Sequence, residues 1–497
     1  MHAPPPKPLT IMVTGATGYI GGRLAPRLLP LGHRVRAMAR DPRRLAALAA
    51  AGAECVAGDA LAPESLAGAL RGVDIAYYLI HSLGAAGDNF ASQDRTAAAN
   101  FAAACAAVGV RRIIYLGGLG SPGPSLSKHL ASRQEVGDVL RAGPVPVTEL
   151  RAAIIVGAGS ASFEIVRDLA RKLPVMICPR WVRSRCEPIA VDQVLEYLIG
   201  VLDEPRTVGE TLEIGGGEVL TYAEMLRQCA AAMGKRVRII GVPVLTPRLS
   251  AYWLNLVTSV PMSIARPLVE GLRNNVVTTD QRIREWIPVT PMTFRQAVER
   301  ALAEDQAGRL ASRWTGATGR SRGAPHARPA AVLEDERIRP ANASPVALFA
   351  AVERIGGATG WYYADWLWRL RGFIDRLLGG VGMRRGRREP LAVALGDPID
   401  FWRVEEFVPG RLLRLRADMK VPGVALLEFE VGGTENETRA LLRQRAEFHP
   451  DGVWGRAYWY ALRPLHALVF RGMAAGIVRA AEGASRSPDD GMTVSPS

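Results

Sequence analysis

The chain has 497 residues, of which 48% are hydrophobic, 22% charged and 6% aromatic. A single hydrophobic core stops growing at about 250–300 residues, so this length predicts two domains, and the hydrophobic share excludes a mostly disordered chain. The 51 glycines and 34 prolines follow no G-X-Y period, which excludes a fibrous protein. With 62 Lys and Arg against 48 Asp and Glu, the net charge of +14 favours phosphate-bearing or other anionic partners.

The cysteines and the apolar segments indicate a cytoplasmic protein. The five cysteines form no CxxC pair, which is typical of reduced thiols rather than of a disulfide framework or a zinc site. They are Cys55, Cys105, Cys178, Cys186 and Cys229. No apolar signal segment precedes the first strand, and no run of about 18 uninterrupted apolar residues exists. We therefore expect neither secretion, nor a membrane span, nor a bound metal.

Short apolar runs alternate with helical patterns in the first part of the chain, which predicts an α/β fold with a doubly wound parallel sheet and right-handed crossovers. The expected strands are Leu9–Val13, His33–Ala39, Glu54–Ala57, Asp74–Ile80, Arg112–Leu116, Val147–Val156 and Glu213–Gly217. The expected helices include one that ends at Gly32, then Leu45–Ala51, Pro63–Leu70, Asp94–Val108 and Tyr222–Met233. Together they predict a first domain over residues 1–305.

Residues 306–330 are rich in Gly, Ser and Arg, which predicts an exposed linker. A second domain of a different class is expected over residues 331–484, followed by a disordered tail over 485–497. Its expected antiparallel strands are Phe401–Phe407, Leu412–Met419, Ala425–Val431 and Arg439–Phe448, with a long amphipathic helix from Tyr458 to Ala481.

Gly15, Gly18 and Gly21 form a G-x-x-G-x-x-G pattern between the first strand and the first helix. In this context, Gly15 permits a tight turn, Gly18 lets the backbone approach a pyrophosphate, and Gly21 allows close contact between helix and strand. The helix N-terminus then offers N–H donors and its positive end. The pattern predicts a dinucleotide-binding turn, although an empty turn would share it.

Arg40 lies at the end of the second strand, where a site that prefers NAD would place an acid against the ribose hydroxyls. With Arg43 or Arg44, it would instead suit a 2′-phosphate, so we expect NADP(H) rather than NAD(H). Asp59 follows the third strand and either contacts the adenine or is a simple turn carboxylate.

These motifs resemble the extended or atypical short-chain dehydrogenases/reductases over residues 9–300. The resemblance rests on VTGATGYIGG, VAGDALAPESLAGAL, NFAAACAAVGVRRIIYLGGLG and LRAAIIVGAG. HSLG, LSKHLASRQEVGDVL, GSASFEIV, LPVMICPRWV and EPIAVDQVLEYL resemble a bacterial subgroup with an uncharacterised C-terminal domain. The resemblance implies cofactor binding through Gly15, Thr17, Gly18, Tyr19, Ile20, Arg40, Asp59 and Leu61, places Ile80, His81 and Ser82 beside the nicotinamide, and gives Asn100 a structural role.

The chain departs from that family where ordinary members carry their catalytic Ser and Tyr-x-x-x-Lys. The Ser position falls within Gly117-Gly118-Leu119, and the Tyr-x-x-x-Lys position aligns best with His129 and Arg133. His129 is therefore a candidate for proton transfer, because an imidazole titrates near neutral pH. Arg133, which stays protonated, would hold substrate or cofactor by charge. Alternatively, both residues lie on a helix surface without a chemical role, and Tyr77, Tyr78 and His81 are further candidate donors.

The second domain resembles the helix-grip class, also called SRPBCC or START-like, through GDPIDFWRVEEFVPGRLLRLRADMKVPGVALLEFEV and GRAYWYALRPLHALVF. Its aromatic and apolar residues either line a ligand cavity or form the core. They are Trp402, Trp454, Tyr458, Trp459, Tyr460, Leu465, Leu468, Val469 and Phe470. Arg463 and His466 either orient a head group or are exposed or paired. Trp366 to Arg388 holds seven Arg against Asp375, which indicates a solvated or paired basic face, or peripheral contact with an anionic membrane.

The combined features favour an NADP(H)-dependent oxidoreductase that acts on a small apolar carbonyl, enone or quinone-type substrate. Two alternatives remain at this stage. One is an inactive NADP(H)-sensing or scaffold protein similar to the NmrA-like members of the superfamily, and the other is a lipid-binding protein. No nucleic-acid signature accompanies the basic residues, so we expect no nucleic-acid partner. The sequence leaves the substrate and the oligomeric state open.

Overall fold

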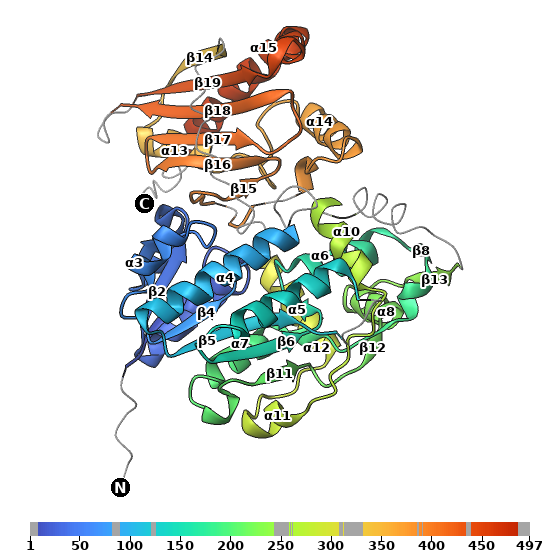
Figure 1. Cartoon of the computed structure of the whole chain (residues 1–497). Coiled ribbons are helices and arrows are strands. Elements are labelled where there is room, and N and C mark those ends of the chain that lie inside the picture. The colour runs from blue at the N-terminus through green and yellow to red at the C-terminus, as the bar shows by residue number, and fades with distance from the viewer. Residues whose placement is uncertain are drawn as a thin grey trace, which may run out of the picture. The chain divides into compact units, whose positions relative to one another are not determined.

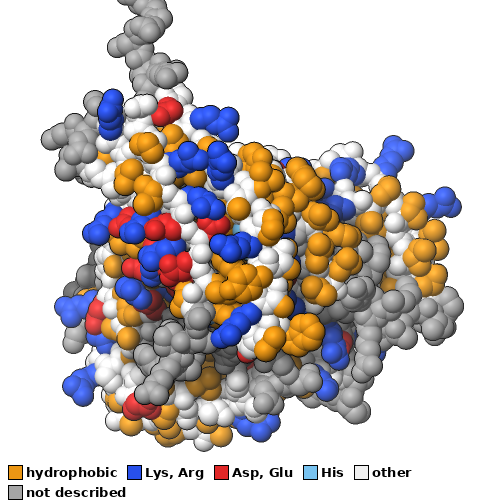
Figure 2. Space-filling model, turned by 90° about the horizontal axis from the view of Figure 1, so that it is seen from above, with side chains coloured by type: hydrophobic (Ala, Val, Ile, Leu, Met, Phe, Trp, Pro, Cys, Tyr) orange, Lys and Arg blue, Asp and Glu red, His pale blue; other side chains and the backbone are white. Residues whose placement is uncertain are grey.

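The computed structural model describes residues 8–81, 90–120, 126–242, 258, 260, 262–307, 312, 332–384, 387–389, 391–433 and 439–485. The chain divides into two compact units, Met1–Gly319 and Arg320–Ser497. Figure 1 traces both units from the N-terminus to the C-terminus. On the face shown in Figure 2, acidic side chains gather beside basic ones, whereas other basic side chains lie among hydrophobic ones.

The first unit is built on a seven-stranded parallel sheet with the strand order β11-β6-β5-β4-β1-β2-β3. Its strands are β1 (Thr10–Val13), β2 (Arg34–Ala39), β3 (Glu54–Ala57), β4 (Ile75–Tyr78), β5 (Arg112–Gly118), β6 (Val147–Ala152) and β11 (Thr211–Ile214). Helices cover both faces of this sheet (Figure 1). The predicted doubly wound α/β fold is therefore confirmed.

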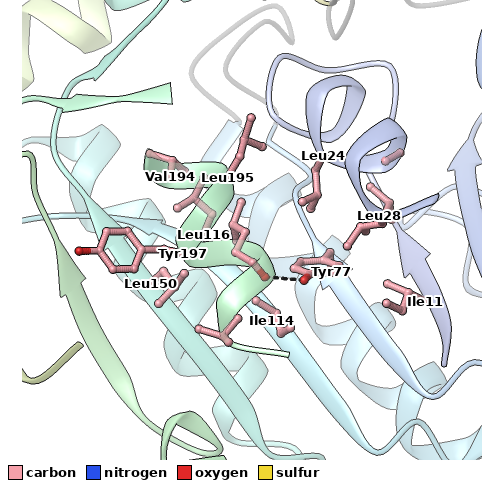
Figure 3. Packing of buried hydrophobic residues seen from close by; sticks show 14 of the residues in the cluster. Ile11, Leu24, Leu28, Tyr77, Ile114, Leu116, Leu150, Val194, Leu195 and Tyr197 are labelled. Carbon is pink, nitrogen blue, oxygen red and sulfur yellow. Dashed lines mark hydrogen bonds between the residues drawn. The ribbon is translucent and has the colours of Figure 1, made fainter. Parts of the chain in front are cut away.

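Alternate strand residues supply the cores on the two faces of the sheet. Ile11 and Val13 of β1 pack with Leu24 of the first helix, whereas Met12 belongs to the core on the opposite face. The first face is covered by α1 (Gly21–Leu28) and α7 (Val191–Gly200), as Figure 3 shows. The second face is covered by α3 (Leu66–Leu70), α4 (Phe90–Val108) and α5 (Lys128–Arg141). A period of two in burial is what a parallel sheet with helices on both sides requires.

The strand order reverses between β1 and β4. β1 pairs with β2 on one side and with β4 on the other, and the later strands continue outward from each of them. In doubly wound sheets, ligands bind outside the carboxyl ends of the strands at such a switch point. This edge therefore positions the residues that follow β1 and β4.

Two predicted strands differ from the structure. Val147–Val156 is not one strand: β6 ends at Ala152, and β7 (Ile155–Val156) leaves the main sheet to pair with β10 (Ile189–Ala190). The strand predicted at Glu213–Gly217 is instead β11, which ends at Ile214 before three successive glycines. Both errors arose because an apolar run does not show where the chain leaves a sheet.

The rest of the first unit forms a smaller layer with a core of its own. Its helices are α6 (Ala161–Lys172), α8 (Tyr222–Ala232), α10 (Met262–Gly271) and α12 (Phe294–Gln306), whereas α2 (Ala46–Ala50) and α11 (Arg282–Trp286) pack against the core of the main sheet. Its strand pairs are β8 (Val175–Cys178) with β13 (Arg238–Gly241), and β9 (Arg185–Cys186) with β12 (Leu220–Thr221). Short 3₁₀ turns lie at Leu29–Leu31, Pro42–Leu45, Pro63–Ser65, Arg180–Arg183 and Pro205–Thr207.

The second unit is a six-stranded antiparallel sheet with the order β14-β19-β18-β17-β16-β15. Its elements are β14 (Leu333–Ala341), α13 (Pro345–Glu353), α14 (Asp365–Leu377), a 3₁₀ turn at Gly382–Arg384, β15 (Pro398–Ile399), β16 (Trp402–Val408), β17 (Leu412–Ala417), β18 (Gly423–Gly432), β19 (Ala440–Pro450) and α15 (Gly452–Ser485). The predicted antiparallel sheet and long helix are confirmed, whereas membership of the helix-grip class stays a prediction.

Helix α15 begins six residues before its predicted start and packs one face into the core of the second unit through Phe470, Met473 and Ile477. Trp402 and Trp459 are also buried, but Trp454 and Tyr460 are 82% and 57% exposed and therefore belong to neither core nor cavity. By length and composition alone, Gly452–Ala484 is long and apolar enough to cross a membrane. Its most apolar window of 18 residues has a mean hydropathy of 1.2, and 39% of that window is buried.

The first residues of the predicted linker, Gln306 and Ala307, are exposed, although Gln306 is still the last residue of α12. Ser312 differs from the prediction, because it is only 6% exposed. The Ser312 hydroxyl donates a hydrogen bond of 2.6 Å to the carbonyl of Tyr19. Residues 308–311 and 313–331 and most of the predicted tail, residues 486–497, lie outside the described residues.

Candidate active site

The turn after β1 has the geometry that the glycine pattern predicts. Gly15 has a φ of +62°, and a Cβ added there would lie 2.6 Å from the carbonyl oxygen of Leu79. The Gly18 amide donates to the Gly15 carbonyl over 2.8 Å, which closes the turn. A Cβ at Gly21 would overlap the carbonyl of Gly15. Gly21 therefore allows the helix to pack closely against the turn, whereas the sequence had predicted close packing against a strand.

The N-terminus of α1 has no side-chain cap in the described part of the chain. Ile20 is its N-cap residue. Backbone N–H groups at an uncapped helix start, together with the helix dipole, favour a phosphate group. Thr17, Gly18 and Tyr19 lie in the same turn, so the residues present fit a dinucleotide pyrophosphate.

The Tyr19 side chain supports this turn through its contact with Arg23. The Arg23 guanidinium lies 5.1 Å from the centre of the Tyr19 ring and donates 2.8 Å to the carbonyl of Ala158. Arg23 also pairs with Glu304 of α12 over 2.6 Å. Burial raises the pKa of the Tyr19 hydroxyl, which favours its protonated form. The side chain thus supports the turn, while only its backbone is placed for phosphate.

The residues predicted to hold the adenosine half lie beyond β2 and β3. Arg40 follows β2 and is exposed, whereas the neighbouring Arg43 is engaged by Asp41 through two hydrogen bonds of 3.0 and 2.9 Å. Oδ1 of the Asp59 carboxylate accepts a hydrogen bond of 3.0 Å from the Leu61 amide. Asn100 donates 2.9 Å to the carbonyl of Ala60, which is the structural role implied for it.

A His–Asp pair and a second histidine meet at the carboxyl edge of the sheet. His81, three residues after β4, places its Nδ1 3.1 Å from Oδ2 of Asp94 on α4. The imidazole rings of His81 and His129, the second residue of α5, have centres 5.1 Å apart. Asp94 is 2% exposed, whereas the His81 side chain keeps 24% of its surface. Leu79 touches Gly15, so the segment that ends in His81 adjoins the cofactor turn.

Both imidazoles are held neutral near pH 7. Burial, and next the charge of Arg133, lower the pKa of His81, although Asp94 partly opposes this. Burial, His81 and Arg133 lower the pKa of His129 well below 6.5. Because a carboxylate only accepts, Asp94 assigns the proton of His81 to Nδ1 and leaves Nε2 as an acceptor. His81 Nε2 and His129 Nδ1 are buried without a hydrogen-bond partner among the described residues.

Arg133 fixes the position of the segments around this pair. Its guanidinium donates to the carbonyl of Leu116 and, over 3.4 Å, to that of Ile80. It also lies 4.9 Å from the ring centre of Tyr115, whose hydroxyl donates 2.8 Å to the Arg133 carbonyl. These contacts make Arg133 a positioning residue in this structure, since its donors are directed at backbone carbonyls.

The missing catalytic serine has a steric reason. A Cβ at Gly117 would lie 2.7 Å from Oε1 of Glu149, and one at Gly118 would lie 3.0 Å from Leu130. Glu149 is fully buried on β6 and pairs with Arg141 and Arg151. A serine side chain at either position would displace these groups, so the glycines are part of the packing.

The structure brings most of the predicted site residues to one edge of the sheet and adds two that were missed. Ile80, His81, His129 and Arg133 are adjacent, whereas Ser82 lies outside the described residues. Tyr77 and Tyr78 are buried core residues, and the Tyr77 hydroxyl donates to Leu198 (Figure 3). Asp94 and Glu149 were not predicted, because an acid that lies far along the chain from its partner gives no pattern in the sequence.

Two family models match separate parts of the chain. Residues 15–156 match a family described as NAD(P)H-binding, and residues 328–473 match a family described as a protein of unknown function (DUF2867). The first match covers the glycine turn, Arg40, His81, Asp94 and His129. The second covers β14 to most of α15.

Several similar proteins are named as reductases, and one as an uncharacterized sugar epimerase. A ceramide reductase of Caulobacter vibrioides is 29% identical over 47% of this chain and 73% of its own length. A (4-alkanoyl-5-oxo-2,5-dihydrofuran-3-yl)methyl phosphate reductase of Streptomyces griseus is 28% identical over 55% of this chain and 92% of its own length. A solved triphenylmethane reductase of Citrobacter sp. overlaps 59% of this chain and 99% of its own, at 21% identity and a TM-score of 0.49. The names of the two curated relatives support an oxidoreductase, and the chain carries an NAD(P)H-binding Rossmann domain followed by a DUF2867 domain.

Proposed function

We propose that this chain is an NADPH-dependent reductase that acts on an apolar carbonyl, enone or quinone-type substrate. The observation that carries the proposal is that the segment ending in His81 adjoins the glycine turn, so that a pyrophosphate site and an Asp94–His81–His129 cluster share one edge of the sheet. The names of two relatives support the substrate class. One contains an alkanoyl group beside an oxo group, and another, 34% identical over 21% of this chain, is a 2-alkyl-3-oxoalkanoate reductase.

When bound, the nicotinamide supplies the hydride, and the chain's own residues bind, orient and manage the proton. The backbone of Gly15 to Ile20 holds the pyrophosphate, and Arg40 binds the 2′-phosphate that distinguishes NADPH. Arg133 fixes the carbonyls of Ile80 and Leu116, which sets where His81 lies. Asp94 then orients the His81 imidazole so that Nε2 faces away from the carboxylate.

The lowered pKa of both histidines sets which acceptors suit the site. A neutral imidazole is a weak acid, so it delivers a proton slowly at the moment of hydride transfer. Enones and quinones accept hydride to give anions that are stabilised by conjugation, and these take up their proton afterwards. His81 or His129 passes this proton from water, which requires no tyrosine.

The test is NADPH oxidation by the full chain with three acceptors: a 2-alkyl-3-oxoalkanoate ester, an enone and a quinone. We expect turnover with at least one acceptor, loss of cofactor binding in Gly15→Val, and retained cofactor binding with lost turnover in the double variant His81→Gln/His129→Gln. Tight NADPH binding without turnover for any acceptor would favour the sensor or scaffold alternative. Absence of NADPH binding would overturn the proposal altogether.

The state of the cysteine thiols supports a reducing compartment for this protein. All five cysteines are free, and four of them are buried. Burial raises the pKa of Cys105 to about 12 and that of Cys178 to about 11, so these thiols are poorly reactive. Free structural thiols are typical of a reducing compartment such as the cytoplasm, where NADPH is also available.

A further inference from the structure

Helix α14 of the second unit turns an apolar stripe toward solvent. Trp366, Leu370, Phe373, Ile374 and Leu377 are 65%, 46%, 43%, 42% and 44% exposed. Their spacing of four, seven, eight and eleven residues from Trp366 places all five on one face of the helix. A soluble helix normally buries such a stripe, so this face is built to contact something outside the second unit.

The opposite face of the same helix already holds it in place. Trp368 is 8% exposed, and its ring is stacked 4.7 Å from that of Trp361 and lies 6.5 Å from that of Phe470 in α15. Gly372 and Asp375 are also buried. The core of the second unit is thus complete without the outer stripe, which remains available to a partner.

The charges around the stripe are basic, because the acidic side chains of α14 turn inward. Asp375 is fully buried and accepts hydrogen bonds of 2.8 Å from the amides of Gly382 and Lys420. Asp365 accepts 2.8 Å from the amide of Trp361. Arg369 and Lys420 are exposed at the edges of the stripe. The rim therefore presents cations next to aromatic and aliphatic side chains.

Basic residues on the sheet of this unit behave differently. Arg414 pairs with Glu406 over 2.8 Å and with Glu428, which also accepts from Arg445 over 2.8 Å. Their charges are balanced by partners within the sheet. In the described part of α14, the carboxylates of Asp365 and Asp375 accept from backbone amides instead, so the positive charge of Arg369 and Lys420 is complementary to an anionic partner.

Further apolar side chains are exposed at the start of α15. Val453 and Trp454 are 80% and 82% exposed. The carbonyl of Pro422 accepts 2.9 Å from the amide of Asp451, just before α15, and the Lys420 ammonium donates 2.8 Å to the carbonyl of Leu378, just after α14. The short segment between Lys420 and Pro422 thus links the end of α14 to the start of α15, which adds an exposed tryptophan to the surface.

We propose that the outer face of α14, with Lys420 and the first turn of α15, binds the surface of a membrane that contains anionic lipids. Exposed tryptophan, phenylalanine and leucine on a helix with a basic rim are the features of a helix that lies in the plane of the interface. With 13 residues, α14 is shorter than the ~20 residues that a spanning helix needs, so it lies on the bilayer rather than across it. This inference is independent of the proposed reductase activity, but it would bring that activity to apolar substrates dissolved in a bilayer.

The test is flotation of the full chain with vesicles of phosphatidylcholine alone or of phosphatidylcholine with phosphatidylglycerol. We expect binding to the phosphatidylglycerol vesicles that weakens as salt is raised. The double variant Trp366→Ser/Phe373→Ser should bind about tenfold more weakly. The matched control is Ile338→Ser/Val346→Ser, which removes two apolar side chains that are 53% and 60% exposed elsewhere in the same unit and should change nothing.

A charge-reversal pair separates lipid binding from nonspecific adhesion. Arg369→Glu should weaken binding to the anionic vesicles, whereas Arg479→Glu on another part of α15 should not. NADPH affinity and turnover of a water-soluble acceptor should be unchanged in all four variants, because none of these residues lies in the first unit. Equal binding by the wild type and by Trp366→Ser/Phe373→Ser would overturn the proposal. So would a stripe that instead mediates self-association, seen as a dimer of the wild type that this double variant dissociates without any vesicle binding.

Discussion

At the scale of single residues, Asp94 decides the chemistry of the proposed site, because it is the buried carboxylate that orients His81. Asp94→Asn keeps an oxygen that can accept from Nδ1 but removes the negative charge, so the pKa of His81 should fall further. We expect turnover to drop by about 10²-fold with the affinity for NADPH unchanged, as measured by steady-state kinetics and by fluorescence titration of the cofactor.

The control for this variant is Asp74→Asn. Asp74 accepts 2.8 Å from the Thr10 amide at the amino end of the sheet, away from the carboxyl edge that holds the site. Its replacement should leave turnover within the range of the wild type. Equal losses in both variants would mean that Asp94 acts on the fold rather than on His81.

Arg40 governs the choice of cofactor. A charge-assisted hydrogen bond to a phosphate contributes roughly 1.5–3 kcal/mol, so Arg40→Ala should weaken NADPH binding about tenfold or more and leave NADH binding unchanged. Calorimetric titration of both cofactors checks this. Arg71→Ala, which removes another exposed arginine of the first unit, should alter neither affinity. An unchanged ratio of the two affinities in Arg40→Ala would assign the 2′-phosphate to another residue.

At the scale of elements, the turn between β1 and α1 requires glycine at position 15. Gly15→Ala adds a methyl group at a φ of +62° and 2.6 Å from the Leu79 carbonyl, so it should lower the free energy of unfolding by about 1–3 kcal/mol and weaken cofactor binding. Chemical denaturation measures the first effect. Gly68→Ala in α3, where an added Cβ meets nothing within 4 Å, should be neutral or stabilising.

The elements themselves could largely be predicted, because local patterns determine them. The alternation of Ile11, Met12 and Val13 between two cores explains why the strands of the first sheet were found. The break at Ala152 was missed because the apolar run continues through Ile154–Val156, while the pairing of β7 with β10 depends on residues more than 30 positions away. A local pattern carries no information about such a partner.

The site was predictable to the extent that its residues follow strands. Gly15, Arg40 and His81 each lie within three residues of the end of a strand, and parallel strands bring their carboxyl ends to one edge. Asp94 and Glu149 gave no such signal, because each is an acid within a helix or strand whose role depends on tertiary burial. Likewise, Ser312 falls in a segment of linker-like composition, yet it binds the Tyr19 carbonyl.

At the scale of the whole molecule, three histidines make stability depend on pH. Burial lowers the pKa of His81, His129 and His466 in the folded state. The unfolded chain, with a histidine pKa of about 6.5, then binds more protons than the folded one, so stability is present above that pH and is lost as the pH falls below it. Urea unfolding at pH about 7.5 and about 5.5 should show a lower midpoint at the acidic pH.

His129→Gln tests the source of this dependence. Each histidine kept neutral by the fold adds at most about 1.4 kcal/mol per pH unit to the slope, so the variant should flatten the loss of stability between these pH values. The buried carboxylates Glu187 and Glu428, whose pKa is lowered, act in a more acidic window below about 4.5. An identical slope in wild type and variant would show that His129 is not the titrating group.

The two units should fold independently, because each has a core of its own. The buried clusters of the first unit draw their residues from Ile11 to Ala301, and that of the second unit from Ala341 to Ala481. A chain of this length needs no second unit to bury a sizeable core. Residues 1–319 alone should therefore bind NADPH with the affinity of the full chain, and residues 320–497 alone should keep a cooperative unfolding transition and bind anionic vesicles.

Calorimetry of the full chain should resolve two transitions that match those of the fragments. A single transition in the full chain, together with unfolded fragments, would instead mean that each core depends on the other unit, and the membrane surface and the reductase site would then have to be treated as one cooperative structure.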